Sequence, residues 1–190
     1  MGQRVLMLAY SEKPIIGDQL PSDMKPFAII TLSDNIRRDA IQTIEWFKKN
    51  EVNVKVISGD NPVTVSEVAK RAGVEGADKY VSLEGMSEAD VIACATKYNV
   101  FGRVTPEQKA ILVKALKHAG HTVAMTGDGV NDILAMKEAH CSVTVASGSD
   151  ATKNIAHIVL MDNNFNSMPH VVAEGRRVIN NIEKSSSLFL

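Results

Sequence analysis

Two carboxylates stand close together in the loop of residues 126–132, whose sequence Thr-Gly-Asp-Gly-Val-Asn-Asp directly follows a short apolar run. Neighbouring carboxylates repel each other, so this spacing favours a cation or a phosphate group between them. Gly127 and Gly129 allow a ligand to approach the backbone around Asp128. Because Mg²⁺ prefers one or two carboxylates together with phosphate and water oxygens, the loop is a candidate magnesium site. For this string alone, a turn in which Asp132 caps a helix is an open alternative.

A second polar string, Ser58-Gly59-Asp60, follows the apolar residues 54–57, and the Asn-Pro pair after it is typical of a helix start. A hydroxyl and free N–H groups at a helix N-terminus bind anions. Ser58 is therefore a candidate phosphate ligand. Taken alone, this string also suits an ordinary turn of an α/β protein.

The third candidate is Lys109, in the first turn of a helix that the sequence predicts for residues 106–118. An ammonium group at this place can neutralise a carboxylate or phosphoryl oxygens as a point charge. Lysines are common on protein surfaces, so Lys109 alone indicates little. The order of the three features along the chain carries the argument: a hydroxyl, then a lysine, then an acidic pair.

These features lie between short apolar runs and amphipathic stretches that alternate along the chain. This alternation is typical of an α/β fold with a parallel sheet that helices cover on both faces. Ligands of such sheets bind at the carboxyl ends of the strands. The sequence predicts strands at 5–9, 27–32, 54–57, 79–82, 100–102, 122–126, 142–145 and 158–160, and helices at 37–50, 63–72, 87–98, 106–118 and 167–190.

Composition narrows the class of protein. The 190 residues are enough for one full hydrophobic core, and a formal net charge of −1 gives no basic field for nucleic acid, which is not expected as a partner. Cys94 and Cys141 lack the spacing of a zinc site or a disulfide framework, which fits a reducing compartment. No apolar stretch has the length of a transmembrane helix, so we expect a soluble chain. Its final helix turns apolar toward residue 190, which indicates that more hydrophobic residues follow.

Longer strings around these motifs resemble the haloacid dehalogenase-like superfamily and, more closely, the cytoplasmic phosphorylation domain of P-type ATPases. The resemblance spans the chain from about residue 4 to residue 190 and implies a three-layer, Rossmann-like parallel sheet with helices on both faces. The strings that carry it are ISGDN, GRVTPEQK, MTGDGVNDILAMKEA, VASGSDATKNIAHIVLMDNNF and EGRRVINNIEK.

The resemblance also implies roles for single residues, with Mg²⁺ and ATP as cofactors. Ser58 resembles the hydroxyl residue that contacts the phosphoryl group, and Lys109 the lysine that holds the nucleophile and the phosphate. Asp128 looks like the Mg²⁺ ligand, which Asp132 joins. The string LSDNIR at 32–37 is similar to the family's hinge, D-P-P-R, without its prolines. The other positions that match the family's site are Gly59, Asp60 and Asn131 for catalysis, and Asp34, Arg37, Arg103, Thr126, Gly127 and Gly129 for cofactor binding.

The family's nucleophile, the aspartate of a D-K-T-G string, has no counterpart in this sequence. We therefore expect that this strand lies upstream in a longer parent protein and that the fragment alone is inactive. The resemblance places the strand between those that end at Ser58 and Thr126, where unpaired backbone groups are costly. We expect the N-terminal segment 4–9 or a neighbouring chain, through strand exchange or a dimer, to fill this place.

The resulting prediction is a piece of a membrane protein that couples ATP hydrolysis, through an aspartyl-phosphate, to cation transport. Residues 1–26 would end a nucleotide-binding domain, 27–175 would form the later part of the phosphorylation domain, and 176–190 would begin a stalk helix toward a transmembrane segment. The parent would act at the cytoplasmic face of the cell membrane, on Ca²⁺, Mg²⁺ or monovalent cations. The alternatives are a stand-alone phosphatase of the same superfamily, which needs its own nucleophile, and a response-regulator-like binding module.

Overall fold

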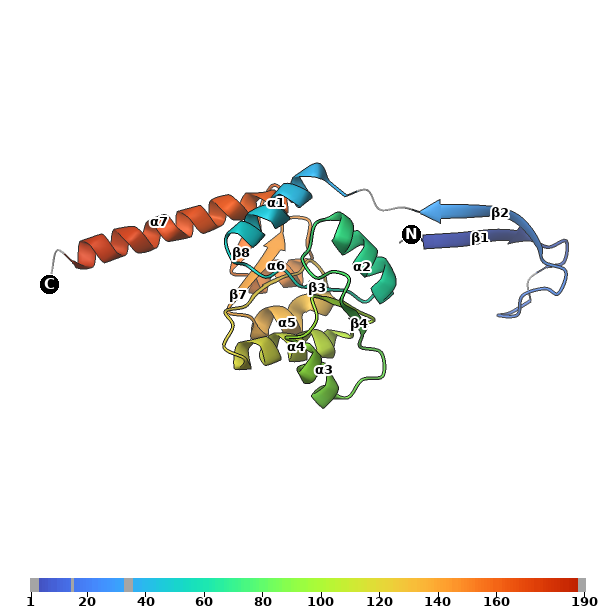
Figure 1. Cartoon of the computed structure of the whole chain (residues 1–190). Helices are drawn as coiled ribbons and strands as arrows, with labels where there is room; N and C mark the ends of the chain where they lie inside the picture. The colour runs from blue at the N-terminus through green and yellow to red at the C-terminus, as the bar shows by residue number, and fades with distance from the viewer. Residues whose placement is uncertain (1–3, 15, 33–35, 188–190) are drawn as a thin grey trace. The chain divides into compact units, whose positions relative to one another are not determined.

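The computed structural model describes residues 4–14, 16–32 and 36–187, and the chain divides into two compact units, 1–35 and 36–190. The first unit contains a β-hairpin in which β1 (Arg4–Tyr10) pairs antiparallel with β2 (Lys25–Leu32) (Figure 1). Apolar side chains alternate onto both faces of this hairpin and remain exposed. They are Val5, Leu6, Met7, Leu8, Phe27, Ile29 and Ile30. A two-stranded hairpin with exposed apolar faces is only marginally stable by itself.

This pairing corrects the expectation that the N-terminal segment fills the place of a missing central strand. β1 pairs with β2, and neither strand belongs to the sheets of the second unit. The expected strand at 27–32 is confirmed, but it lies in the first compact unit rather than after a boundary at residue 26. An antiparallel hairpin satisfies both strands locally, and this local pairing prevails over a distant parallel one.

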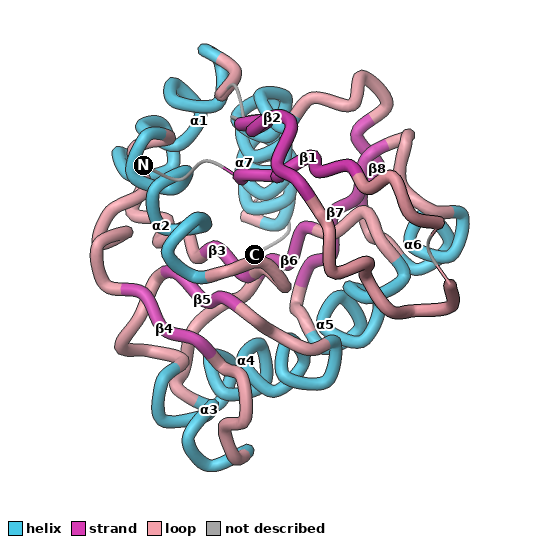
Figure 2. Tube along the Cα trace, turned by 90° about the vertical axis from the view of Figure 1, so that its right-hand side faces the viewer, coloured by secondary structure: helices cyan, strands magenta, loops and turns pink. Residues whose placement is uncertain are grey.

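The second unit has two three-stranded sheets in which all pairs are parallel, as predicted. The first has the order β3-β5-β4 and the second β6-β7-β8, and Figure 2 shows the strands following one another as β4, β5, β3, β6, β7 and β8. The predicted strands all form, with ends that shift by a residue or two. Their bounds are β3 (Val56–Ile57), β4 (Tyr80–Ser82), β5 (Val100–Gly102), β6 (Ala124–Thr126), β7 (Cys141–Val145) and β8 (Ile158–Leu160).

β3 and β6 are each an edge strand of their sheet within the described residues. The N–H groups of Val56 and Ser58 donate to the β5 side, to the carbonyl oxygens of Asn99 and Phe101. Because alternate residues of a parallel strand face opposite neighbours, the N–H group of Ile57 points away from β5. The sheet therefore offers a backbone edge on this side of β3.

Helices cover both faces of the strands, which confirms the α/β expectation. The predicted helices at 37–50, 63–72, 87–98, 106–118 and 167–190 all form, and the caps expected from the sequence are present: the side chains of Asn61, Ser87 and Thr105 accept backbone N–H groups. The bounds are α1 (Arg38–Lys49), α2 (Pro62–Arg71), α3 (Glu88–Cys94), α4 (Pro106–His118), η1 (Val130–Asp132), α5 (Ile133–Glu138), α6 (Asp150–Ile155), η2 (Phe165–Ser167) and α7 (Met168–Ser186).

One face of the strands is covered by α3, α4 and α5, and the other by α1, α2 and the first turn of α7 (Figure 2). Leu112 of α4 packs with Phe101 of β5, whereas Val113, the next residue, packs with Met125 of β6. Both α4 side chains are buried almost completely. Helix α4 therefore joins the two sheets and fixes its first turn near the carboxyl ends of β5 and β6.

The last helix, α7, extends away from the strands (Figure 1). Its first residue, Met168, is buried against Phe47 of α1, but Val178, Ile179 and Ile182 are exposed. No helix in the described part of the chain is both long enough and apolar enough to cross a membrane.

Candidate active site

The loop after β3 is tied to the loop after β5 by backbone hydrogen bonds. The carbonyl oxygen of Ser58 accepts from the N–H of Val104 at 3.1 Å, and that of Asp60 accepts from the N–H of Arg103 at 2.9 Å. The Oγ atom of Ser58 accepts from the N–H of Asp60 at 3.1 Å. These bonds hold the Ser58 hydroxyl at the carboxyl end of β3, next to the loop that leads into α4.

Lys109 and Asp132 meet across two elements. The Nζ atom of Lys109 donates to Oδ1 of Asp132 at 2.6 Å, and the two side chains are only 13% and 12% exposed. The other carboxylate oxygen, Oδ2, accepts from the N–H of Gly129 at 3.3 Å. Charge-assisted hydrogen bonds of this length are among the strongest in proteins, and exclusion of water strengthens them further. The sequence placed both residues in one site, and the structure joins them.

The side chain of Asp132 requires a glycine at position 127. A Cβ atom at Gly127 would lie 2.4 Å from Cβ of Asp132, whereas one at Gly129 would approach Asp132 no closer than 3.7 Å. The N–H of Gly127 donates to the carbonyl oxygen of Val143 in β7. The backbone at the end of β6 therefore passes so close to the carboxylate that no side chain fits at Gly127.

The carboxylate of Asp128 is exposed, but its backbone is anchored. Its carbonyl oxygen accepts from the N–H of Ser149 at 2.9 Å and lies 3.4 Å from Oγ1 of Thr152. Ser149 and Thr152 are not among the residues predicted for the site. The available signal was the string SGSDAT, in which hydroxyl residues flank the start of a helix.

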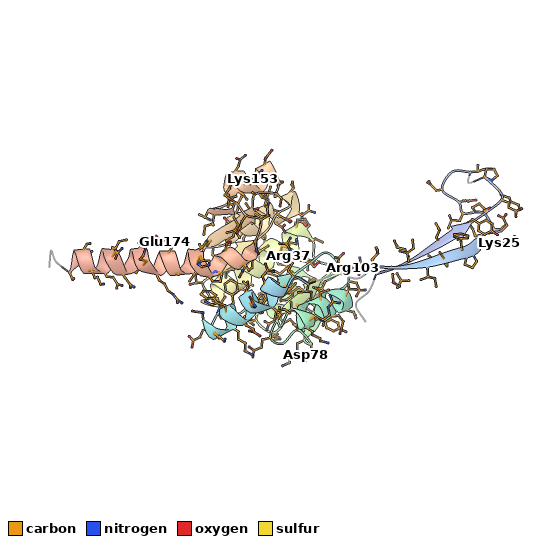
Figure 3. The ribbon with its side chains drawn as sticks, turned by 90° about the horizontal axis from the view of Figure 1, so that it is seen from above. Lys25, Arg37, Asp78, Arg103, Lys153 and Glu174 are labelled. Carbon is orange, nitrogen blue, oxygen red and sulfur yellow. The ribbon has the colours of Figure 1, made fainter. Side chains whose placement is uncertain are left out.

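Other predicted site residues are less closely connected. Asp34 lies outside the described residues. Arg37 precedes α1, and Arg103 follows β5 in a left-handed conformation with φ 53° (Figure 3). In the described part of the chain, no hydrogen bond or ion pair joins either arginine to Lys109, Asp128 or Asp132. Gly59, Thr126 and Asn131 are exposed at the ends of β3 and β6 or beside them.

The carboxylate oxygens at the end of β6 are suitable ligands for one Mg²⁺ ion. The described residues contain no group of three or more His, Cys, Asp or Glu side chains that could enclose a metal ion. Mg²⁺ needs less, since it binds through one or two carboxylates and completes its octahedron with water and phosphate oxygens. The exposed carboxylate of Asp128 offers such a ligand, while both oxygens of Asp132 are engaged with Lys109 and Gly129.

Comparisons with known proteins agree with this geometry. The haloacid dehalogenase-like hydrolase family matches residues 2–140, and a second family of the same description matches residues 109–172. The fold is also that of solved ATPase structures. A zinc-transporting PIB-type ATPase in an E2.Pi state matches 96% of this chain and 28% of that chain with a TM-score of 0.66 at 24% identity. The catalytic domain of the CPx-ATPase CopB-B matches 81% of this chain and 54% of that chain, with a TM-score of 0.55 at 23% identity.

Curated relatives match the whole chain. A probable cation-transporting ATPase, exp7, from Streptococcus pneumoniae is 46% identical over 100% of this chain and 25% of its own length. The calcium-transporting ATPase CtpE from Mycobacterium bovis is also 46% identical, over 100% of this chain and 24% of its own length. The chain thus spans about a quarter of these relatives, which favour the ATPase prediction over the stand-alone phosphatase. From its motifs, its parallel sheets and the family match, the chain belongs to the haloacid dehalogenase-like hydrolases, and the curated relatives to which it is similar are cation-transporting ATPases.

Proposed function

We propose that this chain is the later part of the phosphorylation domain of an ATP-driven cation pump and works only together with an upstream segment. The observation that carries the proposal is the Lys109–Asp132 pair, held out of water beside the exposed carboxylate of Asp128. In phosphoryl transfer a protein mainly positions groups and offsets charge. A buried lysine and a nearby free carboxylate supply the positive charge and the cation ligand for that task.

The strand that would carry the nucleophile has room to pair at the edges of the two sheets. β3 and β6 are edge strands in the described part of the chain, and a strand inserted between them would pair on both sides. We propose that an upstream strand ending in D-K-T-G takes this position. Its aspartate would then emerge at the carboxyl edge where Ser58, Lys109 and Asp128 lie. Buried backbone N–H and C=O groups without hydrogen-bond partners are costly. The inserted strand would pair with those of β3 and β6 and so stabilise the domain.

In this site each residue has a separate task. The hydroxyl of Ser58 donates to a phosphoryl oxygen, and Lys109, held in place by Asp132, offsets the charge of the transferred group. Asp128 binds Mg²⁺, which when bound neutralises phosphoryl oxygens. Direct ligation of the metal by Asp132 stays a prediction, since its oxygens would have to leave Lys109 and Gly129. Gly59, Asp60, Thr126, Gly127, Gly129 and Asn131 shape the loops around the phosphoryl group, and Asp34, Arg37 and Arg103 are proposed contacts of ATP.

The remaining segments suit a larger pump. The hairpin of β1 and β2 exposes apolar side chains on both faces, as does a strand pair taken from the inside of a larger sheet. We assign it to the nucleotide-binding domain, and α7 to a stalk that leads to the membrane from the cytoplasmic side. Calcium is the first cation to test, because relatives at 45–46% identity are named calcium-transporting ATPases.

The proposal is tested by supplying the upstream half as a separate polypeptide and adding radiolabelled ATP with Mg²⁺. We expect an acid-stable, hydroxylamine-labile label on the upstream half only, which Lys109→Met and Asp128→Asn in this chain reduce strongly. Replacement of the D-K-T-G aspartate by asparagine is the matched control and should abolish the label. A label on this chain, or hydrolysis of a phosphate monoester by this chain alone, would instead support the stand-alone phosphatase.

A further inference from the structure

We propose that Thr152 is a positioning residue that fixes the backbone of Asp128 through Ser149. The role of the Asp128 carboxylate itself rests on the function proposed above. Thr152 lies in α6, has no role among the predicted site residues, and is fully buried with 0% exposure. A buried hydroxyl has to find hydrogen-bond partners, and that of Thr152 lies within 3.5 Å of oxygen atoms of Thr144, Ser149 and Asp128.

Thr152 holds Ser149 at two points. Its N–H donates to Oγ of Ser149 at 3.2 Å, and its Oγ1 donates to the carbonyl oxygen of Ser149 at 2.7 Å. Ser149 then presents its own N–H to the carbonyl oxygen of Asp128 at 2.9 Å. The Oγ1 atom of Thr152 also lies 3.4 Å from that carbonyl oxygen. The start of α6, which is distant in sequence from Asp128, thus places two groups at one backbone atom of the proposed metal ligand.

The surroundings keep this arrangement rigid. Oγ1 of Thr144, another fully buried residue, lies 3.5 Å from Oγ1 of Thr152. A Cβ atom at Gly148 would lie 2.7 Å from Oγ1 of Thr144 and 3.2 Å from Oγ1 of Thr152. The turn before α6 is therefore packed directly against both hydroxyls. Because the carboxylate of Asp128 is exposed and has no such packing of its own, its direction depends on the backbone that this cluster holds.

The first experiment measures amide hydrogen exchange of the 190-residue chain in two matched pairs at position 152. Thr152→Val keeps the shape and removes the hydroxyl, while Thr152→Ser keeps the hydroxyl and loses a methyl group. We expect exchange at the Ser149 amide to rise at least about tenfold in Thr152→Val and to stay near that of the unmodified chain in Thr152→Ser. If Thr152→Val does not fold, Thr152→Ala is compared with Thr152→Ser, since these two differ by one hydroxyl.

A packing role gives the opposite order. If Thr152 only fills space, Thr152→Ser is the more perturbed variant and Thr152→Val exchanges as the unmodified chain does, which overturns the proposal.

The second experiment adds the upstream half and measures the Mg²⁺ concentration for half-maximal phosphorylation. We expect it to rise about tenfold in Thr152→Val and to be restored in Thr152→Ser. If even the unmodified chain supports no phosphorylation, the proposed function fails, and the exchange data still decide whether the hydroxyl holds the Asp128 loop.

Discussion

The ammonium group of Lys109 and the carboxylate of Asp132 form a direct ion pair, with Nζ and Oδ1 only 2.6 Å apart, between the start of α4 and the end of η1. The pair connects a helix that packs on both sheets to the loop that follows β6. Removal of one partner leaves the other charge in a place with little access to water, which is strongly destabilising. The ion pair therefore serves both the stability of the fold and the charge of the proposed site.

We predict that Lys109→Met lowers the free energy of unfolding by about 3 kcal/mol, because the Asp132 carboxylate loses its partner. Lys114→Met is the matched control on the same helix. Lys114 pairs with Glu138 at 3.4 Å but is 53% exposed, so its loss should cost about 0–1 kcal/mol. Urea unfolding at neutral pH measures both. If both variants lose the same free energy of unfolding, burial of the Lys109–Asp132 pair does not increase its contribution to stability.

The two glycines of the acidic loop should respond differently to alanine. Gly127→Ala forces a Cβ atom to 2.4 Å from Cβ of Asp132, which displaces that side chain and should cost about 2 kcal/mol. Gly129→Ala leaves 3.7 Å to the nearest atom of Asp132, at a φ of −106° that alanine tolerates. We expect the free energy of unfolding of Gly129→Ala to lie within about 0.5 kcal/mol of that of the unmodified chain. A neutral effect of Gly127→Ala in thermal or urea unfolding would contradict this close packing.

Acid should destabilise the chain in part through Asp162. The hydroxyl of Ser167 and the N–H of Asn164 donate to this carboxylate and lower its pKa from the ordinary 3.8. A carboxyl group whose pKa is depressed in the folded state contributes stability above its unfolded value, and this is lost as the pH falls through the folded value. Urea midpoints between about pH 5 and pH 2 should therefore fall less steeply in Asp162→Asn. Ser167→Ala, which removes the main donor, should reduce the slope in the same direction, and an unchanged slope in both variants would exclude this contribution.

The two compact units should separate without loss of the larger one. Among the described residues, the apolar clusters around the parallel sheets all lie in residues 36–190, and no residue of the hairpin belongs to one. We predict that this segment, expressed alone, gives the same urea midpoint as the full chain and self-associates less, because the exposed faces of β1 and β2 are gone. Sedimentation velocity checks the second point. A shorter segment that unfolds or aggregates would show that the hairpin supports the rest of the fold.

Much of the fold follows from local sequence patterns. Short apolar runs predicted the strands, and the residues that cap helices, such as Thr105 before α4, predicted where helices begin. Helix α6 was missed, since its six residues, Asp150–Ile155, are too few to show a helical period. The place of β1 was wrong because an apolar run indicates that a strand exists and does not determine its partner, which here is the adjacent β2.

The sequence predicted which loops form the candidate site but not the side-chain contacts within it. Parallel strands bring their carboxyl ends to one edge, so the alternation of strands and helices predicts that the loops of Ser58, Lys109 and Asp128 lie on the same side of the sheets. The pairing of Lys109 with Asp132, and the support of Asp128 by Ser149, depend on how α4 and α6 pack. No spacing within the sequence contains that information, because it arises from tertiary contacts.

The division into two half-sheets has a cost during biosynthesis. If the upstream strand proposed above pairs between them, the open backbone edges of β3 and β6 can template another extended peptide until that strand arrives. Joining the two sheets through that strand would require pairing over a long chain separation, which is slow and leaves such edges exposed in the meantime. Molecular chaperones that shield extended segments should therefore raise the yield of active protein more than any gain in the stability of either half.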